Sequence, residues 1–238
     1  MEETKKLNFH QILWYFIIFS IIGLLIETLF CYFTSGVIES RKGLLWGPFC
    51  PVYGVGAVIL IILLNSVDTN KYFKLFIYGF FIGSILEYLM SYVLEAMYSV
   101  RFWDYTYTGN SINGRICILY SLFWGVLSIF LLKVAKPRID NLINRIPKSI
   151  EKKMDIFITI FFIINVIVTV WAIQTYENRA AEIYNGTYNN KINSNSTNNS
   201  IFEKIEEKHF NNERMKKTFP NLRIKDKDGK EIWIKTIL

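Results

Sequence analysis

The chain has 238 residues, of which 52% are hydrophobic and 16% aromatic, and it carries a formal net charge of +7. This apolar share exceeds that of ordinary soluble domains, so the sequence predicts an integral membrane protein. Because Lys and Arg beside membrane spans usually set topology or meet anionic lipid, the positive charge does not indicate nucleic-acid binding. The three cysteines lack a C-x-x-C spacing and the two histidines are far apart, so neither a disulfide framework nor a metal site is expected.

Five apolar runs predict five transmembrane helices. At about 1.5 Å per residue, a helix of about 20 residues crosses a hydrocarbon core of about 30 Å. The expected spans are 12–33, 48–64, 72–98, 115–132 and 155–175. Pro48 and Pro51 suit the first turn of span two, where proline loses no hydrogen bond. The predicted fold class is therefore all-α, with a polytopic helical membrane domain over 1–175.

Lys and Arg are unevenly distributed among the connections between the spans. Most of those beside the spans lie at the N-terminus, between spans two and three, and in the segment 133–153. The positive-inside rule then predicts a cytoplasmic N-terminus and an external C-terminal tail, in the plasma membrane of a bacterium. In 133–153, apolar residues recur at helical spacing, which predicts a short amphipathic helix on the membrane surface.

The polar tail, 176–238, is expected to be a small appendage. Its Asn- and Ser-rich part, 185–200, predicts a disordered linker. Beyond it, 201–219 suits a small helix, and the following residues predict a hairpin that turns at Asp228 and Gly229.

The first and third spans repeat one pattern. FIIFSIIGLLIETLFCY (16–32) and FIYGFFIGSILEYLMSY (76–92) align at a constant offset, which pairs Gly23 with Gly83 and Glu27 with Glu87. A second alignment pairs spans two and four. We therefore expect spans one and two, and spans three and four, to form a parallel internal repeat.

Small residues form a stripe on each of these four spans. Such residues let helices approach closely in lipid, so the stripes are expected to pack together and bring the two glutamates towards a shared axis. The predicted packing motif comprises Gly23, Gly83, Cys50, Pro51, Gly54, Ser121 and Gly125.

The two glutamates are the candidate site. An unpaired charge at the centre of a bilayer costs about 2.5–3.5 kcal/mol, so Glu27 and Glu87 should be protonated, paired or exposed to water. Arg41 and Arg115 are the expected partners, and Asp104 could extend the site. One interpretation is an ion or substrate site in an outward-opening vestibule. The alternative is a structural network of Glu and Arg that fixes the packing of the two halves.

Other chemistry has little support. Cys50-Pro51 is similar to the Cys-Pro element of heavy-metal pumps, but no second sulfur ligand lies on the same helix, so no metal is expected there. Neither a P-loop nor a hydrolase motif occurs. The chain is therefore not expected to be an enzyme or to need a cofactor.

Two blocks of sequence carry a family resemblance. RKGLLWGPFCPVYGVGA and FWDYTYTGNSINGRICILYSLFWG, together with the Gly-Glu segment of span one, resemble the CmpB-type ABC-transporter permeases, also called ABC-transporter type IV, over roughly residues 8–175. The resemblance implies a bacterial polytopic membrane protein that acts as a transporter permease. The matching positions are Glu27, Gly43, Gly47, Pro48, Cys50, Pro51, Tyr53, Gly54, Trp103, Asp104, Tyr105, Asn113, Gly114, Arg115, Ser121, Trp124 and Gly125.

Three functions remain open from the sequence. The first is a permease subunit that moves a small solute or ion with a separate ATPase, which would contact the segment 133–153. The second is a non-transporting membrane scaffold or lipid-interacting envelope protein. The third is a secondary ion-coupled transporter, which needs no ATPase. Any of them could form a homodimer.

Overall fold

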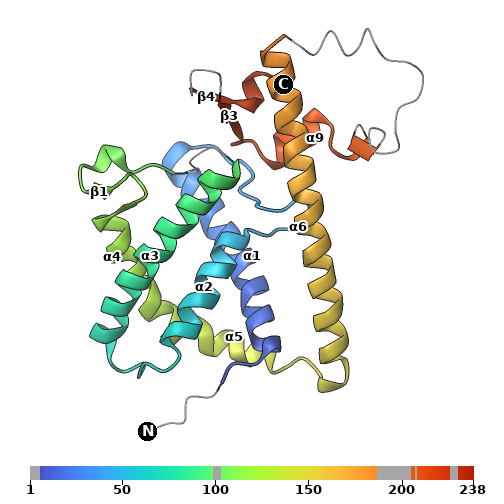
Figure 1. Cartoon of the computed structure of the whole chain (residues 1–238). Helices are drawn as coiled ribbons and strands as arrows, with labels where there is room; N and C mark the ends of the chain where they lie inside the picture. Colours follow the sequence, from blue (N-terminus) through green and yellow to red (C-terminus); the bar gives the residue numbers. More distant parts are fainter. Residues whose placement is uncertain (1–5, 99–102, 187–204, 207, 226–229) are drawn as a thin grey trace. The chain divides into compact units, whose positions relative to one another are not determined.

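A computed structural model describes residues 6–98, 103–186, 205–206, 208–225 and 230–238, and the described chain is mostly helical (Figure 1). The main helices are α1 (Phe9–Ser35), α2 (Pro51–Leu64), α3 (Tyr72–Tyr98), α4 (Ile118–Phe130), α5 (Lys136–Ile143) and α6 (Lys148–Tyr184). A π-helical segment, η2 (Leu131–Ala135), joins α4 to α5. The short elements are η1 (Thr106–Thr108), β1 (Ser111–Ile112), β2 (Ile116–Cys117), α9 (Asn212–Thr218), β3 (Arg223–Lys225), β4 (Glu231–Trp233) and η3 (Ile234–Thr236).

Four described helical stretches are long and apolar enough to cross a membrane. They are α1, most of α3, the continuous stretch Ile118–Ile143 and α6. Helix α2 is equally apolar but has only 14 residues, so it is about 21 Å long and shorter than a hydrocarbon core of about 30 Å. The prediction of helices long and apolar enough to cross a membrane is therefore confirmed for four stretches, whereas the count of five spans stays a prediction.

Helix α2 begins at Pro51, later than the expected start near Pro48. Gly47 has a φ of +78°, and Cys50 has extended backbone with φ −119° and ψ 91°. Both conformations are incompatible with an α-helix, so the residues up to Cys50 form a connection. Pro51 occupies the first turn, where its missing N–H leaves no hydrogen bond unmade.

The chain forms two compact units. The first contains Met1–Gly23 and Cys50–Thr159, and the second contains Leu24–Phe49 and Ile160–Leu238. The core of the first unit draws on α1, α2, α3, η2 and α5. Its buried residues are Tyr15, Phe19, Leu60, Ile61, Leu64, Leu75, Leu131, Leu132, Ile139 and Ile143.

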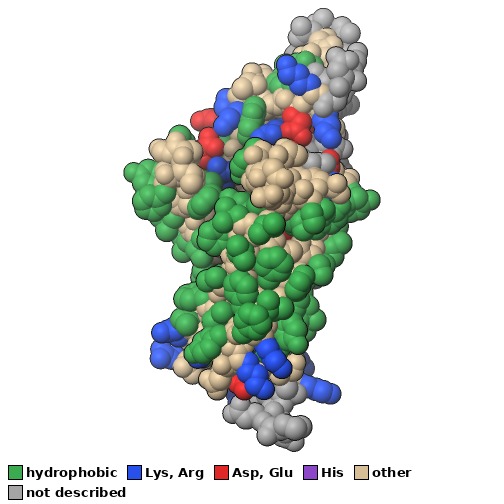
Figure 2. Space-filling model, turned by 90° about the vertical axis from the view of Figure 1, so that its left-hand side faces the viewer, with side chains coloured by type: hydrophobic (Ala, Val, Ile, Leu, Met, Phe, Trp, Pro, Cys, Tyr) green, Lys and Arg blue, Asp and Glu red, His purple; other side chains and the backbone are tan. Residues whose placement is uncertain are grey.

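The outer faces of α3 and α4 are apolar. Figure 2 shows hydrophobic side chains gathered over them, among which Phe81, Ile85, Leu89, Phe123 and Val126 are exposed. Exposed apolar side chains on a continuous helical surface suit contact with lipid tails.

The basic segment after α4 differs from its prediction. The helix does not stop near residue 132, because η2 and α5 continue it to Ile143. Ile139 and Ile143 are buried in the core, whereas Leu142 is exposed. The residues from Lys148 onward already belong to α6. The segment 133–153 is therefore divided between two helices and is not one separate surface helix.

In the second unit, polar groups of α6 hold the connection that follows α1. Asn165, which is fully buried, accepts a hydrogen bond from Trp46 N at 3.2 Å and donates one to Trp46 O at 2.8 Å. Thr169 Oγ1 accepts another from Leu45 N at 2.9 Å. These bonds satisfy backbone groups that have no partner in regular secondary structure.

The described part of the tail is folded. Strands β3 and β4 pair antiparallel, with Ile224 opposite Ile232. Lys235 Nζ lies 3.0 Å from Glu39 Oε1, which joins the tail to the connection after α1. Most of the predicted linker 185–200 and the predicted turn at Asp228 and Gly229 lie outside the described residues.

Candidate functional site

One face of α3 carries a row of polar residues. Ser84, Glu87, Ser91 and Glu95 follow one another at intervals of three or four residues, so they share a helix face. Ser84 Oγ donates to Ser121 Oγ of α4 at 2.7 Å, and both serines are buried. The other three residues bond to α4 and to the segment that precedes it. We call this row and its partners the α3 polar row.

The segment before α4 folds back over α3 through two tight turns. Asp104 Oδ1 accepts a hydrogen bond from Thr106 N at 2.9 Å and so begins η1. Strands β1 and β2 form a short antiparallel hairpin, whose turn contains Asn113 with φ +53° and Gly114 with φ +68°. Asn and Gly are the residues that most readily adopt this left-handed conformation. Tyr105 N donates to Gly114 O at 2.8 Å, which ties the two turns together.

The carboxylate of Glu87 accepts one hydrogen bond on each oxygen. Tyr105 Oη donates to Oε1 at 2.8 Å, and Trp124 Nε1 donates to Oε2 at 3.0 Å. The Tyr105 ring also stacks on Tyr120, with ring centroids 4.6 Å apart. Burial, and then the neighbouring Glu87 charge, raise the pKa of the Tyr105 phenol well above its usual value. Tyr105 therefore remains a hydrogen-bond donor to Glu87 at neutral pH.

Arg115 pairs with Glu95 and not with Glu87. Its Nη2 lies 2.5 Å from Glu95 Oε2, and its Nη1 donates to Ser91 Oγ at 3.0 Å. The guanidinium also lies over the rings of Tyr88 and Tyr92, at 5.7 Å and 5.5 Å. The expected pairing of Arg115 with an intramembrane glutamate thus involves a residue nearer the end of α3.

The remaining predicted site residues are separate from this row. Glu27 belongs to the second unit, where it is half-buried and accepts a hydrogen bond from Cys31 Sγ at 3.6 Å. Arg41 Nη1 donates to the side-chain oxygen of Asn221 at 3.1 Å, with the amide turned to satisfy both of its atoms. Asp104 is exposed, and its carboxylate accepts the hydrogen bond from Thr106 N at the start of η1. Since Glu27 and Glu87 lie in different units, their predicted meeting stays a prediction.

The predicted packing residues of spans one and two lie where α1 meets α2. A Cβ on Gly23 would overlap the Tyr53 side chain, and a Cβ on Gly54 would overlap Phe16. Cys50 precedes Pro51 at the start of α2, and its backbone N–H donates to Ser20 O at 3.0 Å. Close approach of these two helices therefore depends on the small residues.

The corresponding residues of spans three and four lie where α3 meets α4. A Cβ on Gly83 would overlap Trp124, and a Cβ on Gly125 would overlap Phe76. Trp124 lies over Gly83 in the position from which its indole N–H reaches Glu87. The packing and the polar row are therefore two consequences of the same helix contact.

Comparison with known families decides the classification. The family model described as "Putative ABC-transporter type IV" matches residues 14–170. This chain belongs to that family. No curated protein and no solved structure matches the chain. Membership in this ABC-transporter family and the long apolar helices together place the chain in a membrane as a transporter component.

The α3 polar row lies wholly within the part of the chain that the ABC-transporter family model matches. The sequence predicts Glu87 as a site residue and Arg115 as a partner of an intramembrane glutamate, but it does not predict the hydrogen bonds that Glu87 accepts from Tyr105 and Trp124. In the sequence, Tyr105 and Trp124 stand out as positions that match the family's sequence blocks. Aromatic residues with a polar atom, placed before and after Asn113 and Gly114, were the available signal.

Proposed function

We propose that the chain is the membrane permease subunit of a transporter, and that Glu87 contacts the small solute or ion that is moved. The main supporting observation is the position of the Glu87 carboxylate, which lies among apolar helices and accepts hydrogen bonds from Tyr105 and Trp124. Ionisable residues within membrane spans mark substrate and ion pathways by default. Family membership supports the transporter role.

The hydrogen bonds of Glu87 suggest how a solute would be accepted. Trp124 belongs to α4, whereas Tyr105 belongs to the segment outside the spans. Withdrawal of Tyr105 would free one carboxylate oxygen for a cation or for a solute that carries N–H or O–H donors. Trp124 would meanwhile hold the other oxygen, so the carboxylate would keep its orientation.

We infer that the four helices form the predicted parallel repeat. Two glycine contacts between α1 and α2 recur between α3 and α4, at positions that the sequence alignment pairs. The paired contacts are Gly23 with Tyr53 and Gly83 with Trp124, and Gly54 with Phe16 and Gly125 with Phe76. On this interpretation Glu27 is the counterpart of Glu87 in the sequence repeat.

The proposed orientation has the N-terminus in the cytoplasm and the tail outside. His10, at the start of α1, bonds to Asp155, near the start of α6. Glu39, which follows α1, pairs with Lys235 of the tail, which follows α6. These contacts support α1 and α6 crossing a bacterial plasma membrane in the same direction, with α2 to α4 completing five spans.

The proposed ATPase partner would meet the cytoplasmic basic surface. This surface consists of side chains that point away from the buried face of α5 or lie at the start of α6. The exposed members are Arg138, Arg145, Lys148, Lys152 and Lys153. An acidic patch on an ATPase subunit would be attracted to them, and this association should weaken as salt rises.

The test of the permease proposal starts from solute binding. Purified full-length protein in detergent is screened for thermal stabilisation by Na⁺, K⁺, amino acids and polyamines, and stabilising solutes are then followed as radiolabelled uptake into proteoliposomes. We expect Glu87→Gln to abolish both the stabilisation and the uptake, while Glu213→Gln, an exposed carboxylate of α9, changes neither. Retained uptake in both Glu87→Gln and Glu27→Gln would refute a carboxylate-based mechanism.

The scaffold function is the second candidate, because the pairing of Arg115 with Glu95 shows that the α3 polar row can satisfy itself internally. It predicts that Glu87→Gln lowers the unfolding temperature and that no solute in the panel is taken up. A secondary transporter would instead show uptake that depends on an ion gradient and not on ATP.

A further inference from the structure

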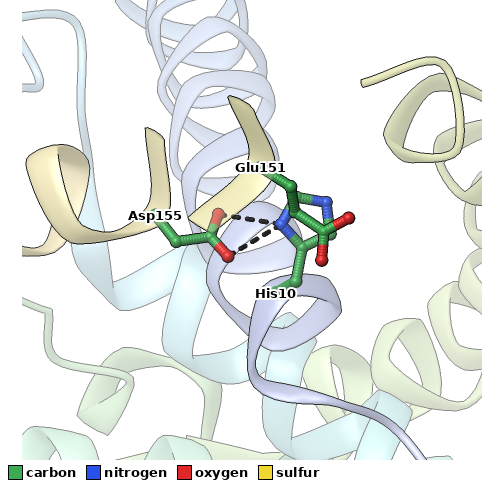
Figure 3. A group of neighbouring side chains, drawn as sticks. All are labelled: His10, Glu151 and Asp155. Carbon is green, nitrogen blue, oxygen red and sulfur yellow. Dashed lines mark hydrogen bonds and ion pairs between the residues drawn. The ribbon is translucent and has the colours of Figure 1, made fainter. Parts of the chain in front are cut away.

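A histidine and two carboxylates meet outside the α3 polar row. His10 lies in the first turn of α1, and Glu151 and Asp155 lie one turn apart near the start of α6 (Figure 3). His10 Nδ1 is 2.8 Å from Asp155 Oδ1 and 2.9 Å from Oδ2. One ligand atom from each of the three residues lies within 4.8 Å of the other two.

Asp155 is held in place by a second donor. Trp14, one turn after His10 on α1, donates from Nε1 to Asp155 Oδ1 at 3.1 Å. His10 and Asp155 are both buried, at 8% and 7% exposure. A hydrogen bond from an indole N–H fixes the orientation of the carboxylate that accepts it. Residues around a metal site orient the metal ligands in the same way. Two of the three residues are therefore already positioned.

Glu151 lies in the first turn of α6, and its carboxylate is the member of the cluster that has no described side-chain partner. Its side chain is half-buried and makes no hydrogen bond or ion pair to any residue that the structure describes. Figure 3 nevertheless shows its carboxylate beside the His10 ring. A half-buried carboxylate next to the His-Asp pair adds a negative charge that a bound cation would offset.

We propose that His10, Glu151 and Asp155 bind a divalent transition-metal ion of the Zn²⁺ class and that this ion links α1 to α6. One imidazole nitrogen with two carboxylate oxygens is a ligand set that Zn²⁺ uses, and three protein ligands leave a position for water. Ligands about 2.1 Å from one ion lie about 3.0–3.4 Å apart, so a small inward movement of Glu151 completes the site. The two carboxylates neutralise the charge of the ion.

This site is independent of the proposed transport function, because none of its residues contacts the α3 polar row in the described structure. It lies instead at the starts of two long helices, α1 and α6, which are the first and the last helix of the membrane domain in the sequence. The ion would therefore act as a cross-link between the first and last spans, and its loss would loosen that contact.

The test is metal binding by the full-length protein in detergent after treatment with a chelator. Zn²⁺ is titrated calorimetrically, and Co²⁺ is titrated as a spectroscopic substitute whose visible absorption reports nitrogen and oxygen ligands. We expect one saturable site per chain. Glu151→Gln should weaken it at least about tenfold, the smallest loss usual even for outer-shell substitutions. His209→Gln, which removes an exposed histidine of the tail, should leave it unchanged.

Glu151→Gln keeps the bond between His10 and Asp155, so it tests the site even if His10→Gln or Asp155→Asn fails to fold. Absence of saturable Zn²⁺ binding would overturn the proposal. So would wild-type affinity in Glu151→Gln, since the pair alone would then account for the binding. A loss that appears only in His209→Gln would assign the metal to the tail and would also overturn it.

Discussion

Breaking the ion pair between Arg115 and Glu95 should destabilise the protein measurably. Their side chains are 10% and 24% exposed, and Nη2 and Oε2 are 2.5 Å apart. Removing one partner of a fully buried pair costs about 3–5 kcal/mol, whereas an exposed pair contributes about 0–1 kcal/mol. The partial exposure of Glu95 places this pair between the two limits, so we expect Arg115→Met to lower the free energy of unfolding by about 2 kcal/mol.

The double variant Arg115→Met/Glu95→Gln separates the pair from its surroundings. Because the second substitution removes the carboxylate that the first one strands, the double variant should be less destabilised than the sum of the two single variants. We expect a coupling energy of about 1–2 kcal/mol from reversible unfolding in mixed micelles. The matched control is the cycle of Arg115→Met with Glu87→Gln, which should show less than about 0.5 kcal/mol. A larger coupling to Glu87 than to Glu95 would refute the pairing.

Two further predictions concern packing and the connection after α1. Gly83→Ala should lower the melting temperature, because its Cβ would overlap Trp124 and overpacking costs about 1–3 kcal/mol. Gly56→Ala, whose Cβ would lie 3.9 Å from the same ring, should instead be neutral or stabilising by up to about 1 kcal/mol. Asn165→Leu should expose the connection at Trp46 to protease, because each unpaired backbone group costs about 1–3 kcal/mol. Unchanged cleavage would contradict that role.

The membrane helices could be predicted because the bilayer imposes a strong constraint. Every backbone polar group in lipid must be satisfied within the segment, so long apolar runs become helices. The start of α2 could not be predicted in the same way. Hydropathy does not distinguish residues 48–50 from the helix, and the difference arises from the backbone conformations of Gly47 and Cys50.

The sequence predicts Glu87 and Arg115 as site residues, whereas their partners in the structure depend on local geometry. Helical spacing predicts that Glu87 shares a face of α3 with small residues, but the partner of Arg115 depends on the hairpin turn at Asn113 and Gly114. That turn aims the guanidinium at Glu95 and leaves Glu87 to Tyr105. The direction of a side chain after a left-handed turn depends on the local backbone conformation, which residue spacing alone does not predict.

The cluster of His10, Glu151 and Asp155 was missed for a different reason. Its histidine and its carboxylates are far apart along the sequence, near the two ends of the segment that forms the membrane domain, so spacing gives no sign that they meet. The available signal was the pair of acids one turn apart at the start of a long apolar helix. Such a pair places two carboxylates on one face, where a third ligand can come from any neighbouring helix.

The π-helical segment Leu131–Ala135 determines which neighbour α5 meets. A π-turn accommodates one residue more than an α-turn, so everything after it is rotated by about 100° relative to a regular helix. The buried face of α4 meets α3 through Ser128, whereas α5 turns Asp140 to Tyr15 of α1. Deleting one residue from this segment would restore a regular helix and turn Asp140 away from α1. The number of residues in this turn, more than their identity, therefore determines whether α5 contacts α1 while α4 contacts α3.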